Sequence, residues 1–530
     1  MSNFAFRLFA ALLAAPLLAA ASASASVPDD FDARLQAAME EYGAPGFAVA
    51  IVENGEVVHA KGYGVRQLGS PAPVDADTIF PTGSTGKAVT TAALAILVDE
   101  GKLDWDDRVI DHLPDFRMHD AWVTREMTVR DLLVHRSGLG LGAGDLLYVP
   151  RTSRSRADVV RALRHIEPAT SFRSGYAYDN ILYVVAGELV AKVSGQSWES
   201  FIRDRVFRAA GMDSSVSDED ERFANPNRAH PHARIDGPVR GAGTQEVLPE
   251  REGLGQVAAP AGGLSSSAND LGRWLQVQLA QGELPGSGRL YSEAAAREMW
   301  TPQVLIPIRA YPEPISEMTP QFSSYALGWN VQDYRGVKTV QHGGAVFGVL
   351  TMVVLVPDRD VGFALQMNSE DYPVLRGAMN TLLDHYLGLE TKDWYAAYGE
   401  WNRERLEAGA AAVAALADGP EGERGSPSLP LAGYAGSYAD DWYGPIAVTG
   451  DGPGLRIDFK QTPDMAGPLE HHRHDTFIVR WDDRAIEPAY VTFGLDHEGK
   501  VERVTMQAVS PIADFSYNYQ DLEFRPLPAD

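Results

Sequence analysis

The pattern of hydrophobic residues changes once along this 530-residue chain, and that change constrains what the chain can fold into. Residues 27–395 alternate helical and strand signals, which is typical of an α/β or α+β domain. From residue 428 to the end no helical period appears, and turn residues separate short β-like runs. This second part predicts a small all-β barrel or sandwich. Residues 396–427 lie between the two parts and read as a helix followed by a Gly/Pro-rich linker.

The signals of the first part predict one sheet with helices around it. An Asn-Gly turn at 54–55 joins two apolar runs in the pattern of a β-hairpin. Two later apolar runs, 349–356 and 361–367, predict buried strands, and we expect them to share one antiparallel sheet with the hairpin. Residues 88–100 and 181–194 predict apolar helices, because each run is followed by a glycine.

The first residues have the composition of a secretory leader. Arg7 precedes an apolar run over 8–21, and small Ala and Ser residues follow it. Residues 1–25 therefore predict a cleavable signal peptide and a periplasmic or secreted protein. The apolar run is shorter than the roughly 20 residues that a helix needs to cross a bilayer, so we expect no stable membrane span.

Charge and cysteine content exclude several classes of protein. The formal net charge of −26 repels phosphate backbones, so we expect no nucleic-acid partner. The absence of cysteine excludes disulfides, thiolate metal sites and a cysteine nucleophile. A catalytic nucleophile would have to be a hydroxyl or another non-thiol group.

One short motif carries such a hydroxyl. Ser84 and Lys87 form S-x-x-K at the start of the apolar helix, and a spacing of three places both side chains on one helical face. The helix N-terminus favours negative charge on the attacked oxygen. A buried lysine with a lowered pKa can accept the serine proton. Alone, S-x-x-K is a weak signal.

Further segments strengthen the signal. Y-x-N occurs at 178–180 and H-x-G at 342–344. The segments 127–139, 261–271 and 325–329 add a T-x-R-x-L-L-x-H-x-S-G-L run, a Gly/Ser-rich run and a Y-A-L-G-W run. In order and spacing, this set resembles the β-lactamase and penicillin-binding-protein serine hydrolases, most closely their class C-like branch of esterases and peptidases. The resemblance implies an antiparallel sheet flanked by helices, with an additional all-helical region.

The resemblance also implies roles for the motif residues. Ser84 would be the nucleophile, Lys87 would help to deprotonate it, and Tyr178 would share the general-base role and return the proton to the leaving group. Asn180 would hydrogen-bond Lys87 or the substrate amide. No metal or organic cofactor is implied.

The H-x-G segment would supply the strand edge of the site. The backbone N–H groups of Ser84 and Ala345 would form the oxyanion hole, and Gly343 and Gly344 would let the substrate approach the strand closely. His342 stands where penicillin-recognising relatives carry the lysine of K-T-G. Losing that fixed positive charge disfavours peptidoglycan transpeptidation and strong β-lactamase activity.

Two features leave alternatives open. Asp179 in the middle of Y-x-N either binds a substrate amino group in the cleft or points away, where it is solvated or caps the next helix. His471, His472 and His474 have a spacing that suits zinc, but no further ligands follow, so we expect a surface cluster and no metal site. His135 is expected to be a buried hydrogen-bonding residue.

The C-terminal part, 428–530, resembles the lipocalin-like module that is often attached to this branch. The resemblance implies a barrel that covers the mouth of the active site or mediates homo-oligomers. We therefore expect an exported serine peptidase or amidase that acts on short or unusual linear peptides, including peptides with D-residues or linearised cyclic peptides such as microcystins. A carboxylesterase with the same nucleophile is the nearest alternative. A weak β-lactamase and a non-catalytic sensor or binding protein are the others.

Overall fold

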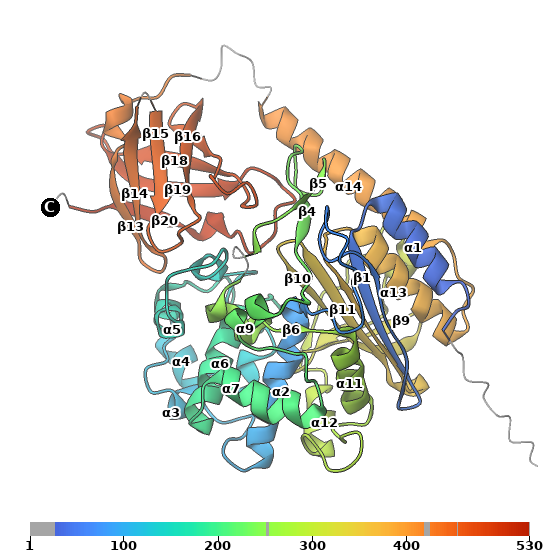
Figure 1. The fold of residues 1–530 in the computed structure, drawn as a ribbon. Coiled ribbons are helices and arrows are strands. Elements are labelled where there is room, and N and C mark those ends of the chain that lie inside the picture. The colour runs from blue at the N-terminus through green and yellow to red at the C-terminus, as the bar shows by residue number, and fades with distance from the viewer. Residues whose placement is uncertain (1–26, 251–253, 418–424, 453, 529–530) are drawn as a thin grey trace, which may run out of the picture.

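The computed structural model describes residues 27–250, 254–417, 425–452 and 454–528 (Figure 1). The predicted signal peptide lies outside these residues. Among them, no helix combines the length and the apolar character needed to cross a bilayer.

An antiparallel sheet forms the centre of the first part, as expected. The early hairpin and the late strands lie side by side in it, since Ala50 pairs with Ala364 and Val353 pairs with the same residue from the other side. The strand order is β2-β1-β12-β11-β10-β9-β8-β7. The bounds are β1 Gly46–Glu53, β2 Glu56–Gly64, β7 Val304–Leu305, β8 Ser323–Tyr325, β9 Asn330–Tyr334, β10 Val337–Val346, β11 Val349–Val356 and β12 Val361–Met367.

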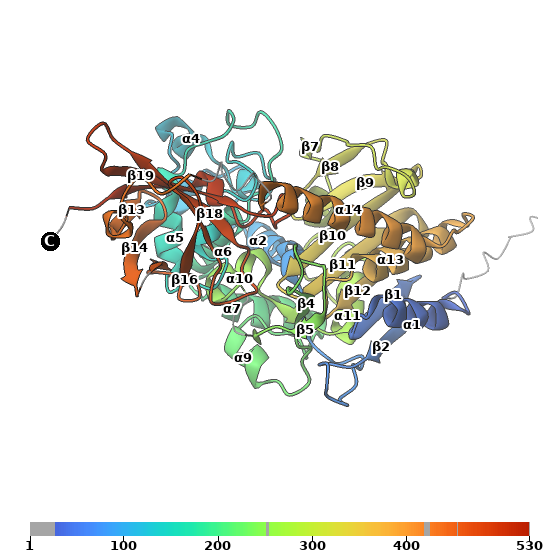
Figure 2. The same ribbon diagram turned by 90° about the horizontal axis from the view of Figure 1, so that it is seen from above.

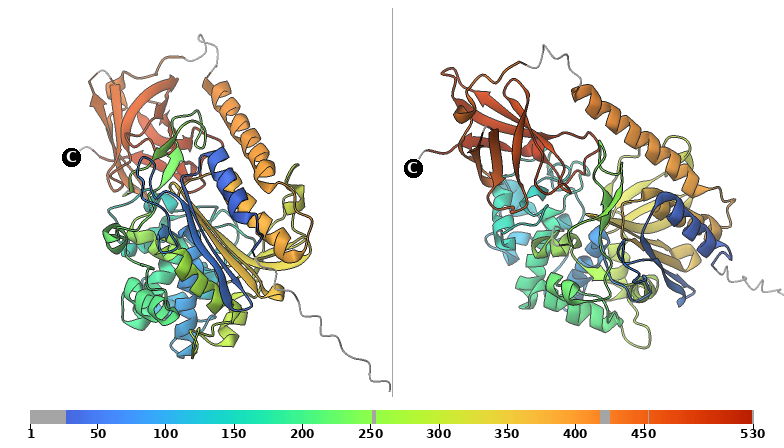
Figure 3. Two further views of the ribbon diagram at one scale, coloured as in Figure 1. Left: turned by 45° about the vertical axis from the view of Figure 1, so that its right-hand side comes forward. Right: turned by 45° about the horizontal axis from the view of Figure 1, so that its top comes forward.

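Helices cover both faces of this sheet, which explains why β1, β11 and β12 are buried along their whole length. One face carries α1 (Phe31–Tyr42) and α13 (Tyr372–Leu387), and α14 (Trp394–Ala417) packs along α13 (Figure 2). The other face carries α11 (Ala268–Leu279) and the helical region (Figure 3).

Two apolar helices form the core of the helical region. They are α2 (Lys87–Asp99) and α6 (Ile181–Ser194), which match the predicted helices to within one residue. Gly195 ends α6 in the left-handed conformation and its N–H caps the carbonyl of Ala191. The shorter helices of this region are α3 Val109–His112, α4 Ala121–Glu126, α5 Arg156–Ala162, α7 Trp198–Phe201, α8 Arg208–Ala210, α9 Glu219–Ala224, α10 Ala259–Gly262 and α12 Glu293–Met299.

The C-terminal part is a closed eight-stranded antiparallel barrel, in which β13 pairs with both β14 and β20. The bounds are β13 Gly436–Asp440, β14 Gly444–Asp451, β15 Gly454–Phe459, β16 Ala466–Arg473, β17 Thr476–Val479, β18 Ala489–Leu495, β19 Val501–Ala508 and β20 Glu523–Pro526. The barrel has a core of buried aromatic side chains, which include Tyr434, Tyr438, Trp442 and Tyr443.

The barrel docks on the helical region through loops. The hydroxyl of Thr152 and the backbone N–H of Ser153 both donate to the Gln461 carbonyl, each at 2.9 Å. The guanidinium of Arg154 donates to the Tyr443 carbonyl and lies 4.4 Å from the centre of the Tyr443 ring. The barrel is therefore held against the helical region by these hydrogen bonds, and the two parts lie side by side in the ribbon (Figure 1).

Candidate active site

Ser84 and Lys87 face one another at the start of α2, as the S-x-x-K spacing predicts. Ser84 lies in the 3₁₀ turn Gly83–Gly86, and Lys87 begins the helix. The Lys87 Nζ donates to Ser84 Oγ at 2.9 Å, to Asn180 Oδ1 at 2.7 Å and to the Ala261 carbonyl at 2.9 Å. These three acceptors match the three N–H bonds of an ammonium group.

Lys87 is fully buried, and burial lowers its pKa from 10.5 to about 7. The negative charges of Asp145 and Asp179 oppose this shift without cancelling it. A large fraction of Lys87 is therefore neutral near pH 7 to 8, and a neutral amine can take a proton from the hydroxyl that it touches.

Tyr178 lies next to Lys87 and lines the same cavity as Ser84. Lys87 Nζ is 4.8 Å from the centre of the Tyr178 ring. Burial raises the pKa of Tyr178 well above 10, and the Ser84 hydroxyl opposes the rise, so the two hydroxyls are neighbours although they do not form a hydrogen bond of normal geometry. Tyr178 is therefore a neutral phenol near pH 7 and can give up a proton more readily than it can accept one.

The edge of β10 approaches the nucleophile so closely that glycine is required. A Cβ on Gly344 would lie 2.2 Å from the Thr82 carbonyl and 2.4 Å from Thr351 Oγ1. The Thr351 hydroxyl donates to the Thr82 carbonyl at 2.6 Å and holds the strand and the turn together. A Cβ on Gly83 would lie 2.7 Å from the backbone nitrogen of Ala345. This contact brings together the two segments whose N–H groups are predicted to form the oxyanion hole.

His342 lies in the cavity wall as a neutral side chain. Its Nδ1 lies 2.7 Å from the Gly343 carbonyl, which only accepts, so Nδ1 carries the proton. Its Nε2 lies 2.8 Å from the Tyr325 hydroxyl and accepts from it. Burial and the Lys87 charge lower the pKa of His342 to about 3. The position that would hold a lysine in K-T-G therefore carries no positive charge.

Asp179 is fully buried and points away from the cavity, so it does not bind a substrate amino group in the cleft. The alternative that it points away is correct, but the expected solvated or helix-capping position is wrong. Its Oδ2 accepts from the Ser137 hydroxyl at 2.8 Å. It is neither solvated nor the cap of α6, because Asn180 occupies the N-cap position. Its charge raises the pKa of Lys87 from behind the site.

His135 is the buried hydrogen-bonding residue that the sequence predicts. Its Nδ1 accepts from the Asp179 backbone N–H at 3.1 Å, and its ring packs 4.2 Å from the Tyr178 ring and 4.4 Å from the Tyr325 ring, centre to centre. The 127–139 segment, which contains His135, therefore packs against Tyr178 and supports it.

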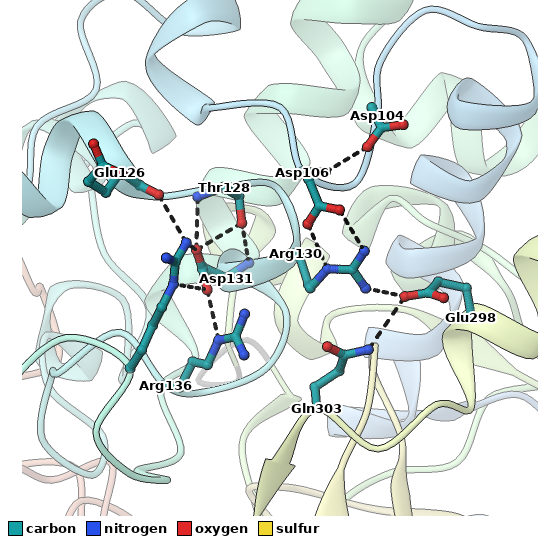
Figure 4. Close-up of polar contacts among 10 residues, drawn as sticks. Asp104, Asp106, Glu126, Thr128, Arg130, Asp131, Arg136, Glu298 and Gln303 are labelled. Carbon is teal, nitrogen blue, oxygen red and sulfur yellow. Dashed lines mark hydrogen bonds and ion pairs between the residues drawn. The ribbon is translucent and has the colours of Figure 1, made fainter.

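An ion-pair network holds that segment in place, as Figure 4 shows. Asp131 is fully buried and accepts from Arg136 Nε at 2.8 Å, from the Thr128 hydroxyl at 2.8 Å and from Arg173. Burial raises the pKa of Asp131, but these donors outweigh the effect and hold it below the usual value. Arg130 beside it pairs with Asp106 at the surface.

A cavity of about 300 Å³ opens onto these residues. Ser84, Tyr178, Asn180, His342, Gly344 and Ala345 all line it, and Lys87 lies behind them. The barrel supplies part of the wall through the loop between β19 and β20, with Asp514, Phe515 and Ser516. The Phe515 ring lies 5.8 Å from the Tyr178 ring, edge to face.

Sequence reasoning missed Asp145 and this barrel loop. Asp145 is fully buried, and burial raises its pKa to about 7 although Tyr148, Asn180 and Ser516 donate to it. An acidic residue in a Gly-rich stretch before an apolar run was the signal available for Asp145.

The histidine cluster lies at the edge of a barrel strand. Among the residues that the structure describes, no group of three or more His, Cys, Asp or Glu side chains has the arrangement to hold a metal ion. His471 Nε2 lies 2.9 Å from the His474 carbonyl and the His472 ring packs on Tyr490, so the cluster sits at the edge of a barrel strand.

Comparison with known proteins agrees with this fold. The beta-lactamase family model matches residues 31–387, and a model described as a domain of unknown function, DUF3471, matches residues 421–526. The fold is thus that of the beta-lactamase and penicillin-binding-protein hydrolases with a barrel attached. The chain belongs to the beta-lactamase family.

Similar curated proteins include hydrolases and a penicillin-binding protein. An "unguisins hydrolase" of Aspergillus campestris is 29% identical over 443 residues, which cover 80% of this chain and 78% of that protein. "Penicillin-binding protein 4" of Amycolatopsis lactamdurans is 31% identical over 339 residues, which cover 63% of this chain and 84% of that protein. The relatives named as hydrolases place this chain among hydrolases of the family.

Two solved structures share the whole two-domain outline. An octameric penicillin-binding protein homologue from Pyrococcus abyssi aligns with a TM-score of 0.58 at 22% identity, over 90% of this chain and 98% of that one. SurE aligns with a TM-score of 0.53 at 21% identity, over 94% of this chain and 98% of SurE. These likenesses concern the fold.

Proposed function

We propose that this protein is a serine peptidase or amidase that hydrolyses short linear peptides through an acyl-enzyme on Ser84. The observation that carries the proposal is the buried Lys87 amine, which has a pKa of about 7 and lies 2.9 Å from Ser84 Oγ at the base of the cavity. A hydroxyl in contact with a neutral amine is an activated nucleophile.

The reaction proceeds in two proton-balanced stages. Ser84 Oγ attacks the carbonyl carbon while its proton passes to Lys87, and the N–H groups of Ser84 and Ala345 stabilise the oxyanion. As the C–N bond breaks, the leaving amine takes a proton from the Tyr178 hydroxyl, which recovers one from Lys87. Water then attacks the ester carbonyl and gives a proton to neutral Lys87. The bond from the carbonyl carbon to Ser84 Oγ breaks as Lys87 returns that proton to Oγ, which releases the acyl product as the acid and restores free Ser84.

This scheme gives Lys87 and Tyr178 different roles. The raised pKa of Tyr178 keeps it protonated near pH 7, so that it has a proton to donate, and the lowered pKa of Lys87 leaves it free to act as the base. A base and an acid whose environments push their pKa values in opposite directions are the usual arrangement in acid–base catalysis.

The enclosed cavity favours short peptides as substrates. Its volume of about 300 Å³ suits a few residues, and the barrel loop stands in the path of a folded protein chain. The relative named unguisins hydrolase and a solved structure titled SurE with D-Leu agree with a small substrate, the latter with a D-amino acid. The predicted leader adds export to the periplasm or the medium.

A carboxylesterase is the second candidate, and the neutral His342 favours it. A site without a fixed cation does not require a carboxylate on its substrate, and an ester offers a better leaving group than an amide. The same absence of charge disfavours β-lactamase activity.

The test combines active-site labelling with a substrate panel. A fluorophosphonate probe should label Ser84, and Ser84→Ala should abolish labelling and turnover with an unchanged circular dichroism spectrum. L- and D-aminoacyl nitroanilides, short peptides, p-nitrophenyl esters and a chromogenic cephalosporin then separate peptidase, esterase and β-lactamase. Hydrolysis retained in Ser84→Ala would refute the mechanism, and ester turnover without amide turnover would favour the carboxylesterase.

A further inference from the structure

A buried carboxylate outside the recognised motifs joins the catalytic residues to the barrel. Asp145 begins the short 3₁₀ turn Asp145–Leu147 and is fully buried. Its Oδ2 accepts from Asn180 Nδ2 and from the Ser516 hydroxyl, both at 2.8 Å, and its Oδ1 accepts from the Tyr148 hydroxyl at 2.5 Å. The donors come from three separate segments, and Ser516 belongs to the barrel.

This carboxylate decides which way the Asn180 amide faces. Lys87 Nζ donates to the carbonyl end of the amide at 2.7 Å, and the NH₂ end donates to Asp145. The Asp145 Oδ2 accepts from the NH₂ end, so the oxygen of the amide is left to face Lys87. Without that acceptor, a flipped amide would present its N–H groups to the Lys87 amine and weaken the positioning of that amine against Ser84.

We propose that Asp145 is a positioning residue of the catalytic centre, which orients Asn180 against Lys87, and that the barrel completes the centre through the Ser516 hydroxyl. This inference rests on the proposed acyl-enzyme function. It makes the barrel a contributor to turnover as well as a wall of the cavity.

The charge of Asp145 also affects the pKa of Lys87, the proposed base. The titratable groups that interact with Asp145 are Lys87 on α2, Tyr148 three residues further along the chain, and Tyr178 before α6. Asp179 acts on the same Lys87, and Asp514 on the barrel loop accepts from the Ser516 backbone N–H. Of the two carboxylates that raise the pKa of Lys87, Asp145 has the larger effect. Removing this negative charge should therefore lower the pH at which Lys87 becomes neutral.

The experiment measures kcat and KM against pH for full-length Asp145→Asn, Ser516→Ala and Ser516→Thr. We expect Asp145→Asn to lower kcat about tenfold with KM within about twofold, and to move the acidic limb of kcat/KM down by about one pH unit. Ser516→Ala should lower kcat about fivefold, and Ser516→Thr, which keeps the hydroxyl, should restore most of it.

Ser428→Ala is the matched control, because the Ser428 hydroxyl donates to Asp475 at 2.8 Å in a barrel hydrogen bond far from the cavity. It should leave kcat, KM and the pH profile unchanged. If Ser84 of the wild type is labelled and turns over substrate, but the Asp145 and Ser516 variants keep the wild-type kcat and acidic limb, the inference is wrong and the proposed function stands. If Asp145→Asn fails to fold, equal kcat values for Ser516→Ala and Ser516→Thr would overturn the inference. If the wild type shows no labelling at Ser84, the proposed function itself fails.

Discussion

Burial of three polar side chains gives this site its acid–base character. Desolvation lowers the pKa of Lys87 to about 7 and that of His342 to about 3, and raises that of Tyr178 well above 10. At neutral pH the site therefore contains a partly neutral amine, a neutral imidazole and a neutral phenol. One physical cause thus produces a base and a proton donor around Ser84.

The pH dependence of kcat/KM should reveal the pKa of Lys87, the proposed base. We expect kcat/KM for an uncharged substrate to rise with pH and to level off above a midpoint of about 7, because only neutral Lys87 accepts the Ser84 proton. His342 should contribute no limb between pH 5 and 9, since its pKa of about 3 keeps it neutral throughout. A midpoint above 9, measured from initial rates in buffers of constant ionic strength, would contradict this assignment.

At the scale of elements, the site exists because a turn and a strand touch. The 3₁₀ turn that carries Ser84 meets β10 at Gly344, and Thr351 on β11 ties the two together. The structure has no room for a side chain at Gly344, because two of the nearest groups are a backbone carbonyl and a hydrogen-bonded hydroxyl, which cannot move aside easily.

Gly344→Ala should therefore separate the strand from the turn. We expect the free energy of unfolding to fall by about 1–3 kcal/mol, the usual cost of overpacking, and fluorophosphonate labelling of Ser84 to slow. Gly343→Ala is the control for stability, because its Cβ would meet only the Met352 methyl at 3.4 Å within ordinary contact distance. Urea unfolding measures the free energy of unfolding of both variants. Equal losses in the two variants would show that the close contact at Gly344 does not cause the loss of stability.

The ion pairs of the segment that packs against Tyr178 predict a difference in stability between two variants. Asp131→Ala should lower the free energy of unfolding by about 3 kcal/mol, because it leaves Arg136 and Arg173 without their buried acceptor. Asp106→Ala removes an ion pair whose carboxylate is 68% exposed and should cost less than about 1 kcal/mol.

The pH dependence of stability provides the check. The depressed pKa of Asp131 stabilises the fold at neutral pH, and this contribution disappears as the pH falls below its ordinary value of 3.8. The difference in unfolding free energy between wild type and Asp131→Ala should therefore shrink in acid. A constant difference from pH 7 to pH 3 would contradict the role of the ionised carboxylate.

Local patterns predicted the elements and the contact between Ser84 and Lys87, but not the contacts between distant segments. The α2 and α6 helices follow from apolar runs that end in glycine, and Ser84 and Lys87 follow from helical spacing. The link from Ser516 to Asp145 joins residues 371 positions apart, and only the docking of the barrel creates it. The orientation of Asp179 was also undetermined, because a residue next to a helix start can face the cleft or the core.

At the scale of the whole molecule, the barrel closes one side of the cavity. Phe515 packs against Tyr178, and a Cβ on Gly142 would lie 2.6 Å from the Phe515 carbonyl, so the loop is seated tightly on the helical region. Homo-oligomerisation through the barrel, which the sequence resemblance implies, stays a proposal for this chain, and light scattering of the purified protein tests it.

Substrate length should depend on this loop. Phe515→Ala should raise kcat/KM for longer peptides relative to dipeptides by about fivefold or more, because it widens the mouth beside Tyr178 without removing a polar group. Leu527→Ala, at a barrel side chain that is 44% exposed, should leave the ratio unchanged. The ratio is measured by competition within one mixture, and an unchanged ratio in Phe515→Ala would show that the loop does not select for length.

The covalent connection between α14 and the barrel has a kinetic consequence. Because the barrel belongs to the same polypeptide, it meets its docking surface on the helical region at an effective concentration on the order of millimolar, whatever the concentration of enzyme. Modest loop contacts therefore suffice to keep the cavity complete at the nanomolar levels of an assay. Two halves expressed as separate chains would instead dissociate on dilution, so the dilution dependence of their rate would measure the docking affinity directly.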